Sequence, residues 1–372
     1  MKKITTRLPH KVQQLTKAVA LICAFCQAPV LWADQSYSYT YDDKGNVLTV
    51  DGPRVDVQDI TTYTYNPDGT RATTTNALGH VTRFNAYDGA GRLISVTDPN
   101  GITTEFTYHV RGWLESVTVR HPTNSSLNAK TTYTYDAVGQ LTRVTLPNGM
   151  ATNYEYTDAR QLKAVFNDLG ERIEYELDAA GNRKKENIKN ATGLIQYSLS
   201  RTFDELSRVM DITGNNGQNV KTTYDVNDNP RTQTNAKSHT TEQQYDALDR
   251  VKKVIDPNLK ETAYTYDAQG NIQTVTDARG NVTRYDYDGL GNLKTLTSPD
   301  TGVTQFTYDE AGNLKTRVDA RGVETRYSYD ALNRVTAVVY PASPTENVTF
   351  TYDNTANGNA GKGYLTGIQD PS

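Results

Sequence analysis

The chain of 372 residues carries a formal net charge of −4, is 36% hydrophobic, and contains 25 tyrosines and 53 threonines. Tyr and Thr favour pleated, half-buried strands. The composition therefore argues against a helix-rich fold, and the low net charge argues against a disordered chain. We expect an all-β protein in which aromatic rings replace part of the aliphatic core.

The N-terminal segment differs from the rest of the chain. Five Lys and Arg side chains precede the first carboxylate, Asp34, and an apolar run of nine residues follows the last of these cations. That run is too short to span a bilayer, and Ala33 is a small residue at which a signal peptidase could cut. We predict a signal peptide over residues 1–33 and export from a bacterial cell, with an uncleaved N-terminal anchor as the alternative. Cleavage would remove Cys23 and Cys26, leaving an exported chain without disulfides.

Residues 34–370 are predicted to form one region of about fifteen tandem repeats, the last of them truncated. Each repeat is anchored by one residue, usually Tyr, that Asp follows in most copies, and nine of the fourteen intervals between anchors are 21 residues. A fixed period of this length indicates one supersecondary unit that recurs along the chain. The anchors are Tyr41, Tyr65, Tyr87, Tyr108, Tyr135, Tyr156, Leu177, Phe203, Tyr224, Tyr245, Tyr266, Tyr287, Tyr308, Tyr329 and Tyr352.

Each repeat contains two turns. In the repeat that follows Tyr266, the first turn begins at Asp267 and the second at Asp277, ten residues later. An Asp at the first turn position can accept hydrogen bonds from the backbone ahead of it, and a Gly three residues later can take positive φ. This pattern is typical of a type I turn closed by a glycine bulge, so we predict positive φ at Gly270, Gly291 and Gly312.

The runs between the turns are rich in strand-forming residues, so each repeat is predicted to be a β-hairpin. Tyr264 and Tyr266 alternate with Thr, which places the two rings on one face of a strand. Leu293 and Leu296 are three residues apart, a spacing that predicts a bulge. We interpret the intervals longer than 21 as longer turns. Stacked hairpins would form one long sheet with a ladder of tyrosines, and its twist would curl it into a spiral.

The motif Tyr-Asp-x-x-Gly-(Asn/Arg)-(Leu/Ile) occurs at 87–93, 266–272, 287–293 and 308–314. It resembles the RHS or YD-repeat family, which includes bacterial Rhs proteins, TcC-like toxin-complex components and the YD shell of teneurins. The resemblance extends over residues 37–368. It implies a spiral β-sheet wound into a hollow shell, which in the toxin members encapsulates a C-terminal effector. No shell-closing core motif and no toxin region follow here, so we expect a short or truncated member that forms a partial shell.

No residue pattern predicts a catalytic, cofactor-binding or metal site, and we expect no enzyme. The repeated Asp residues are interpreted as turn-formers, because a catalytic pair would be unique rather than periodic. The segment from Asp225 to Pro230 resembles the opening of a calcium loop, but Pro230 stands where that loop needs Gly. None of the histidines beyond residue 33 has the spacing of a metal pair; they are His80, His109, His121 and His239.

Two interpretations of the tyrosine ladder remain open. In one, the rings pack along the sheet and their hydroxyls find partners at its edge. In the other, they form an exposed aromatic track for sugar rings. His109 and Trp113 deviate from the repeat pattern, and such a deviation is either drift or a local site.

Two functions follow from the repeat pattern. The first is a secreted or cell-surface structural protein that forms part of the encapsulating shell of an Rhs-type polymorphic toxin or toxin-complex system. Its partner would be a C-terminal toxin or another shell-forming polypeptide. The alternative is a carbohydrate-binding or adhesion module that binds cell-surface glycans. Without residues 1–33, 34 Lys and Arg face 43 Asp and Glu, a balance that argues against nucleic acid as a partner.

Overall fold

The computed structural model describes residues 3–7 and 35–371, which form one antiparallel β-sheet of 31 strands. Each strand pairs with the next along the chain, so the sheet is a continuous meander of hairpins. The strands are β1 Lys3–Arg7, β2 Ser36–Tyr41, β3 Val47–Asp51, β4 Thr61–Tyr65, β5 Arg71–Thr75, β6 Val81–Tyr87, β7 Leu93–Thr97, β8 Thr103–Tyr108, β9 Leu114–Val119, β10 Ala129–Tyr135, β11 Leu141–Thr145, β12 Ala151–Tyr156, β13 Leu162–Asn167, β14 Arg172–Leu177, β15 Arg183–Lys189, β16 Ile195–Phe203, β17 Val209–Gly214, β18 Asn219–Tyr224, β19 Pro230–Asn235, β20 Thr240–Tyr245, β21 Val251–Ile255, β22 Glu261–Tyr266, β23 Ile272–Thr276, β24 Val282–Tyr287, β25 Leu293–Ser298, β26 Gly302–Tyr308, β27 Leu314–Val318, β28 Glu324–Tyr329, β29 Val335–Val339, β30 Val348–Tyr352 and β31 Leu365–Gln369.

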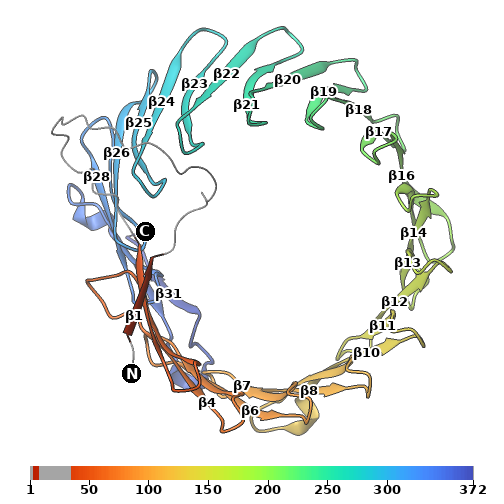
Figure 1. Ribbon diagram of the computed structural model, residues 1–372, viewed down its shortest axis with the longest axis vertical. Coiled ribbons are helices and arrows are strands. Elements are labelled where there is room, and N and C mark those ends of the chain that lie inside the picture. The colour runs from red at the N-terminus through yellow and green to blue at the C-terminus, as the bar shows by residue number, and fades with distance from the viewer. Residues whose placement is uncertain (1–2, 8–34, 372) are drawn as a thin grey trace, which may run out of the picture.

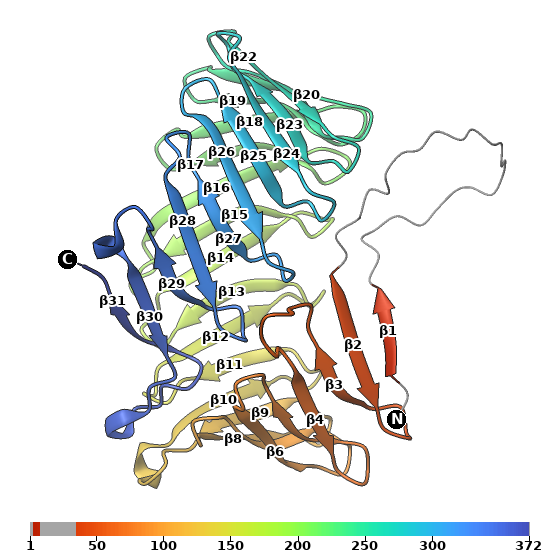
Figure 2. The same cartoon turned by 90° about the vertical axis from the view of Figure 1, so that its left-hand side faces the viewer.

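The sheet bends into a ring that the chain follows for slightly more than one turn (Figure 1). The last strands, β28–β31, return to the side of the molecule where the chain begins, and they lie beside β2–β4 (Figure 2). Helix is confined, within the described residues, to three short 3₁₀ segments, Ser125–Leu127, Pro344–Glu346 and Ala356–Gly358. The predicted all-β spiral of stacked hairpins is confirmed.

The turns have the predicted geometry. Gly270, Gly291 and Gly312 have φ values of 91°, 84° and 83°. In the first turn after β22, Asp267 Oδ1 accepts the Asn271 backbone N–H at 2.8 Å, and Asp267 Oδ2 accepts Asn271 Nδ2 at 3.0 Å. One carboxylate therefore ties both the backbone and the side chain on the far side of the turn.

The predicted bulge is also present. Tyr266 pairs with Ile272 while Thr265 pairs with Thr274, which leaves Gln273 as the additional residue. The equivalent bulge in β25 brings Leu293 and Leu296 to the face of Tyr287 and Tyr285, their respective partners in β24. The bulge explains why apolar residues three positions apart share one face.

The interpretation of every long interval as a long turn is wrong in two cases. The intervals of 24 and 27 residues do contain longer loops, at 52–60 and 120–128. The interval of 22 residues instead contains a second bulge at Asn85, where the register of β6 against β7 shifts. In the interval of 26 residues the extra residues lengthen β15 and β16, and their ladder remains paired. A hairpin can absorb residues by extending its ladder while its turns keep their form.

The sheet is a single layer without a compact core. Within the described residues, the buried hydrophobic side chains are Ala151 and Ala164. The accessible surface is 24,870 Å², whereas a compact globular protein of this mass would expose about 15,000 Å². Contacts between neighbouring hairpins therefore supply most of the stabilisation, as in other repeat proteins.

Most of the predicted signal peptide lies outside the described residues. Its Lys3–Arg7 portion forms β1, which pairs with β2. No helix among the described residues is long and apolar enough to cross a membrane.

Candidate functional site: the ring wall and its seam

The tyrosine ladder links neighbouring hairpins through hydrogen bonds. The Tyr266 hydroxyl, for example, donates to the Val251 carbonyl at 2.6 Å, and Val251 is the first residue of β21 in the preceding hairpin. Desolvation raises the pKa of the Tyr266 hydroxyl, as partial burial in this ladder requires. Eleven anchor tyrosines make the same bond: Tyr65, Tyr87, Tyr108, Tyr135, Tyr156, Tyr224, Tyr245, Tyr266, Tyr308, Tyr329 and Tyr352. These hydroxyls find partners in the sheet, as the packing interpretation predicts.

The hairpin turns form two rims of the ring. We call the turns that follow the anchor residues, such as 267–271, the first rim, and the turns at the opposite strand ends, such as 277–281, the second rim. Arginines reinforce the first rim at four turns. Arg250 pairs with the turn residue Asp246 at 2.6 Å and lies 4.3 Å over the ring of Tyr266 in the next hairpin. Arg92, Arg208 and Arg334 occupy the same position over Tyr108, Tyr224 and Tyr352.

His109 and Trp113 form an aromatic version of the usual turn contact. They occupy the positions that Asp267 and Asn271 hold in another first-rim turn, and the His109 N–H donates to the Trp113 carbonyl at 2.8 Å. Their rings stack with centroids 5.0 Å apart, and the indole lies 5.4 Å from the Tyr135 ring. An aromatic pair thus replaces the Asp–Asn pair and packs on the next hairpin, so its deviation from the repeat has a structural reason.

The ring closes where the second rim of the early hairpins meets the first rim of the late ones. We call this junction the seam, formed by residues 54–100 on one side and 309–362 on the other. The loop between β3 and β4 contacts the turn between β28 and β29, 25 strands further along the chain, and the β5–β6 turn contacts the β30–β31 loop at the same separation. Opposite rims meet, so the sheet advances along its axis as it turns.

Arg54 is the central contact of the seam. Its side chain is only 3% exposed, and it forms a bidentate pair with Asp56, with Nε–Oδ1 and Nη2–Oδ2 distances of 2.9 and 2.7 Å. Across the seam, Arg54 Nη1 donates to the Asp330 carbonyl, and Nε lies 3.8 Å from Asp309 Oδ2. The hydrogen bond with Asp56 raises the pKa of Arg54, which remains a cation.

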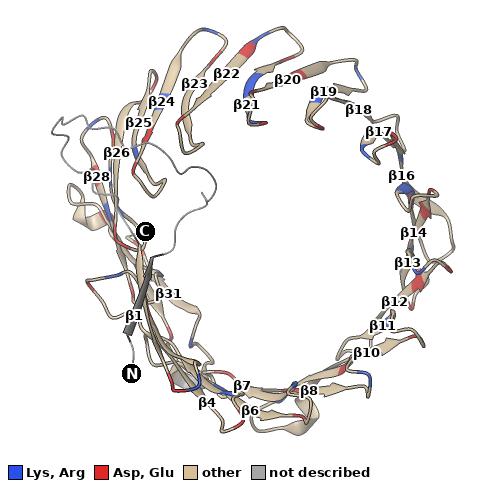
Figure 3. Ribbon diagram, in the orientation of Figure 1, with Lys and Arg blue, Asp and Glu red and all other residues tan. Residues whose placement is uncertain are grey.

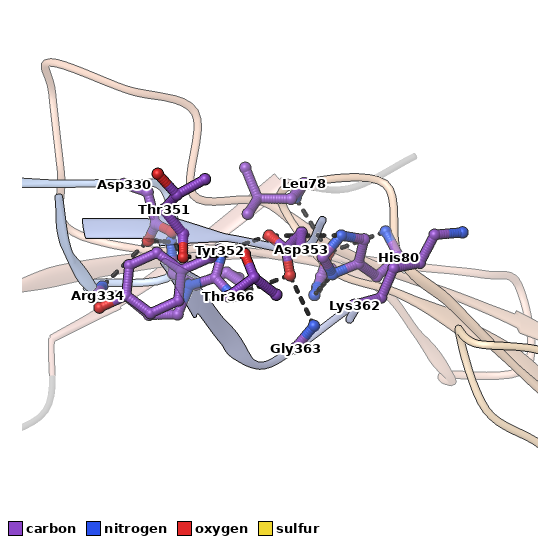
Figure 4. Close-up of polar contacts among 12 residues, drawn as sticks. Leu78, His80, Asp330, Arg334, Thr351, Tyr352, Asp353, Lys362, Gly363 and Thr366 are labelled. Atoms are coloured by element: carbon purple, nitrogen blue, oxygen red, sulfur yellow. Dashed lines mark hydrogen bonds and ion pairs between the residues drawn. The ribbon is translucent and has the colours of Figure 1, made fainter. Parts of the chain in front are cut away.

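A second group of seam contacts surrounds Asp353 (Figure 4). Its carboxylate accepts two hydrogen bonds from Arg334 and one from the Gly363 N–H, and it lies 3.8 Å from His80 Nε2 across the seam. Arg334, desolvation and the Gly363 N–H act on the pKa of Asp353, and the net effect holds it below its usual value. Nearby, Asn100 and the backbone of Lys362 exchange two hydrogen bonds of 3.0 and 2.8 Å.

The histidines do not come together. His80 lies at the seam, His109 in the aromatic pair, His121 in the 120–128 loop and His239 in a second-rim turn. The Asp225 carboxylate accepts the backbone N–H groups of Asn227 and Asn229, as a turn-former does. No cluster of three or more His, Cys, Asp or Glu side chains suited to a metal occurs in the described part of the chain.

Charged residues of both signs are interspersed around the ring (Figure 3). Many of them face each other as ion pairs on neighbouring strands, such as Arg172 with Glu155 at 2.9 Å and Lys253 with Glu261 at 2.8 Å. The wall therefore presents a mixed polar surface.

Comparison with known families and structures places this architecture. The family model described as teneurin YD-shell matches residues 171–359, and that of the RHS repeat matches 87–126 and 135–165. The chain belongs to the YD-shell family. No curated protein matches it.

Solved structures with this fold include three Tc toxin assemblies. TcdB2–TccC3 superposes with a TM-score of 0.68 at 16% identity over 90% of this chain and 20% of its own. The Photorhabdus luminescens Tc holotoxin pore gives a TM-score of 0.60 at 15% identity, over 91% and 22%. TcdB2–TccC3 without its hypervariable C-terminal region gives 0.56 at 15%, over 87% and 18%. This YD-shell chain spans about a fifth of the length of the chains that it matches, and at these identities the likeness shows the fold.

Proposed function

We propose that this YD-shell chain forms part of the wall of an encapsulating shell in an exported toxin system of the Rhs or Tc type. The observation that carries the proposal is the closure of the sheet: a single-layered wall turns through a full circle and joins itself at the seam. Such a wall encloses space without a core that fills it. The Tc assemblies that share the fold support this assignment.

The partner in this proposal is a toxin or another shell-forming polypeptide of the same system. The chain covers about one turn of the spiral, so further turns or caps would have to come from other polypeptide to enclose a cargo completely. The mixed charge of the wall suits a container that must release its content. The repeated turn carboxylates and the dispersed histidines favour a structural role over a catalytic one.

Protease protection tests this function. The coding sequence downstream of codon 372, and the adjacent genes, supply the candidate cargo, which is co-expressed with this chain and treated with a protease. We expect the cargo to be digested much more slowly in the presence of the chain than alone. Equal digestion in both samples, together with binding of the chain to a glycan array, would favour the adhesion module instead.

A further inference from the structure

The joint that closes the ring differs from every other junction in the wall. Consecutive strands are joined by ladder hydrogen bonds all along the described sheet, whereas the seam joins turns and loops through side chains and a few backbone groups. Ladder pairing makes each hairpin dependent on the next, but nothing in the repeat itself makes the first turn meet the last. The contacts at the seam must therefore supply the closure.

The 52–60 loop is built for one shape. An ideal Cβ at Gly52 would lie 2.0 Å from Asp59 Oδ2, so the loop backbone and this carboxylate approach more closely than any other residue would allow. The Arg54 N–H donates to the same Asp59 oxygen at 3.3 Å, and the Arg54 side chain is held by Asp56. The guanidinium is thus oriented before it meets the opposite rim.

The opposite rim receives Arg54 with fixed acceptors. The Asp330 carbonyl belongs to a turn closed by the hydrogen bond from the Asn333 N–H, and Asn333 Oδ1 lies 3.5 Å from Arg54 Nη1. Asp309 adds a carboxylate from the preceding first-rim turn. A nearly fully buried guanidinium that lost these partners would be left with unsatisfied donors and incompletely balanced charge, so separation of the rims is strongly disfavoured while Arg54 is present.

We propose that the 52–60 loop is the latch of the ring, and that Arg54 locks the start of the spiral onto the turns 25 strands later. The His80–Asp353 and Asn100–Lys362 contacts are more exposed and align the rims without holding them. In the absence of the latch the hairpins remain paired and the sheet becomes an open spiral. This inference concerns the closed form of the ring and does not depend on what the shell contains.

Cross-linking across the seam tests the latch in the full chain. Leu78 and Lys362 lie on opposite sides of the seam (Figure 4), and Lys362 makes its seam contacts through its backbone. Both are replaced by cysteine, Cys23 and Cys26 are replaced by serine, and a short flexible bismaleimide is added. In this background we expect Arg54→Ala to slow intramolecular cross-linking by at least about tenfold and to raise the radius of gyration measured by X-ray scattering.

The control is Arg83→Ala, which removes an exposed arginine from β6, outside the seam. It should cross-link at the parent rate. Arg54→Lys retains the cation but cannot make the bidentate pair, and it should lie between the two. Circular dichroism establishes that each variant keeps its strands. If Arg54→Ala loses them, the decision passes to Arg54→Lys. A folded Arg54 variant that cross-links at the parent rate with an unchanged radius would overturn the proposal.

Discussion

At the scale of single residues, the most informative position is the fourth of each turn. Glycine occupies it in most hairpins, but several turns hold a larger residue there in the same left-handed conformation, such as Arg160 with φ 62° and Leu259 with φ 61°. This conformation costs a residue with a Cβ about 1–2 kcal/mol. The repeat therefore tolerates local strain where the ladder on both sides fixes the turn.

Relief of that strain is testable at Leu259. This side chain is 81% exposed, so Leu259→Gly removes few contacts, and we expect it to raise the stability of the protein by about 0.5–1 kcal/mol. Leu248, also exposed and at the third position of its turn, provides the matched control, and Leu248→Gly should give no gain. Urea unfolding measures both. Equal effects of the two substitutions would show that the left-handed conformation is not the source.

The tyrosine hydroxyls can be tested singly. Tyr266→Phe removes the donor to the Val251 carbonyl and should destabilise the local hairpins by about 1 kcal/mol. Tyr264 lies on the same face of β22, and its hydroxyl has no hydrogen-bond partner among the described residues, so Tyr264→Phe should be near neutral. Thermal unfolding of both variants compares them. A loss at Tyr264 as large as at Tyr266 would assign the effect to ring packing.

At the scale of the hairpin, the sequence predicted the architecture because the information is local. An Asp and a Gly three positions apart determine a turn, and the spacing of Leu293 and Leu296 revealed a bulge that the register confirms. The length of β15 and β16 was not predicted. Counting residues between anchors shows that five were added, but it does not show whether a loop or a ladder received them.

The turn carboxylates make the hairpins sensitive to acid. The Arg208 side chain, and then its backbone N–H, hold the pKa of Asp204 below its usual value, and Asn182 does the same for Asp178. A lowered pKa in the folded state contributes stability above the unfolded value, near 3.9, that is lost as the pH falls through the folded value. We expect the urea midpoint to be nearly constant between about pH 8 and pH 5 and to fall steeply below about pH 4.

A variant of one turn isolates this effect. Asn167 already occupies the first position of another turn, where its Oδ1 accepts the backbone N–H groups of Leu169 and Glu171. Asp277→Asn should therefore keep its turn while it removes one titrating group. The variant should lose less stability between about pH 5 and pH 3 than the parent does. An identical pH profile would place the acid sensitivity elsewhere.

At the scale of the whole molecule, stability should vary along the ring. The six consecutive 21-residue repeats place β17–β28 in an uninterrupted run, with paired neighbours on both sides, whereas β30 and β31 lie at an end of the sheet. We expect amide hydrogen exchange to be slowest in β17–β28 and fast in the 120–128 loop. The β15–β16 hairpin, whose long interval suggested early opening, is continuously paired and should be protected.

Uniform protection from β2 to β31 would contradict this expectation and would mean that the seam couples the two ends of the sheet. The seam itself was beyond prediction from the sequence. Its partners are 262 to 276 positions apart, and whether they meet depends on the curvature summed over all the intervening strands. The one local sign was the 24-residue interval after Tyr41, whose extra residues form the loop that carries Arg54.

The separation of 25 strands between the joined turns has a consequence for parity. In a meander, turns an even number of strands apart share a rim, and turns an odd number apart lie on opposite rims. Because each repeat contributes two strands, duplication or loss of whole repeats leaves odd separations odd. A wall that lengthens by repeats still brings unlike rims together, so its joint can be rebuilt with the same kind of turn contacts. Loss of a single strand would instead bring like rims together.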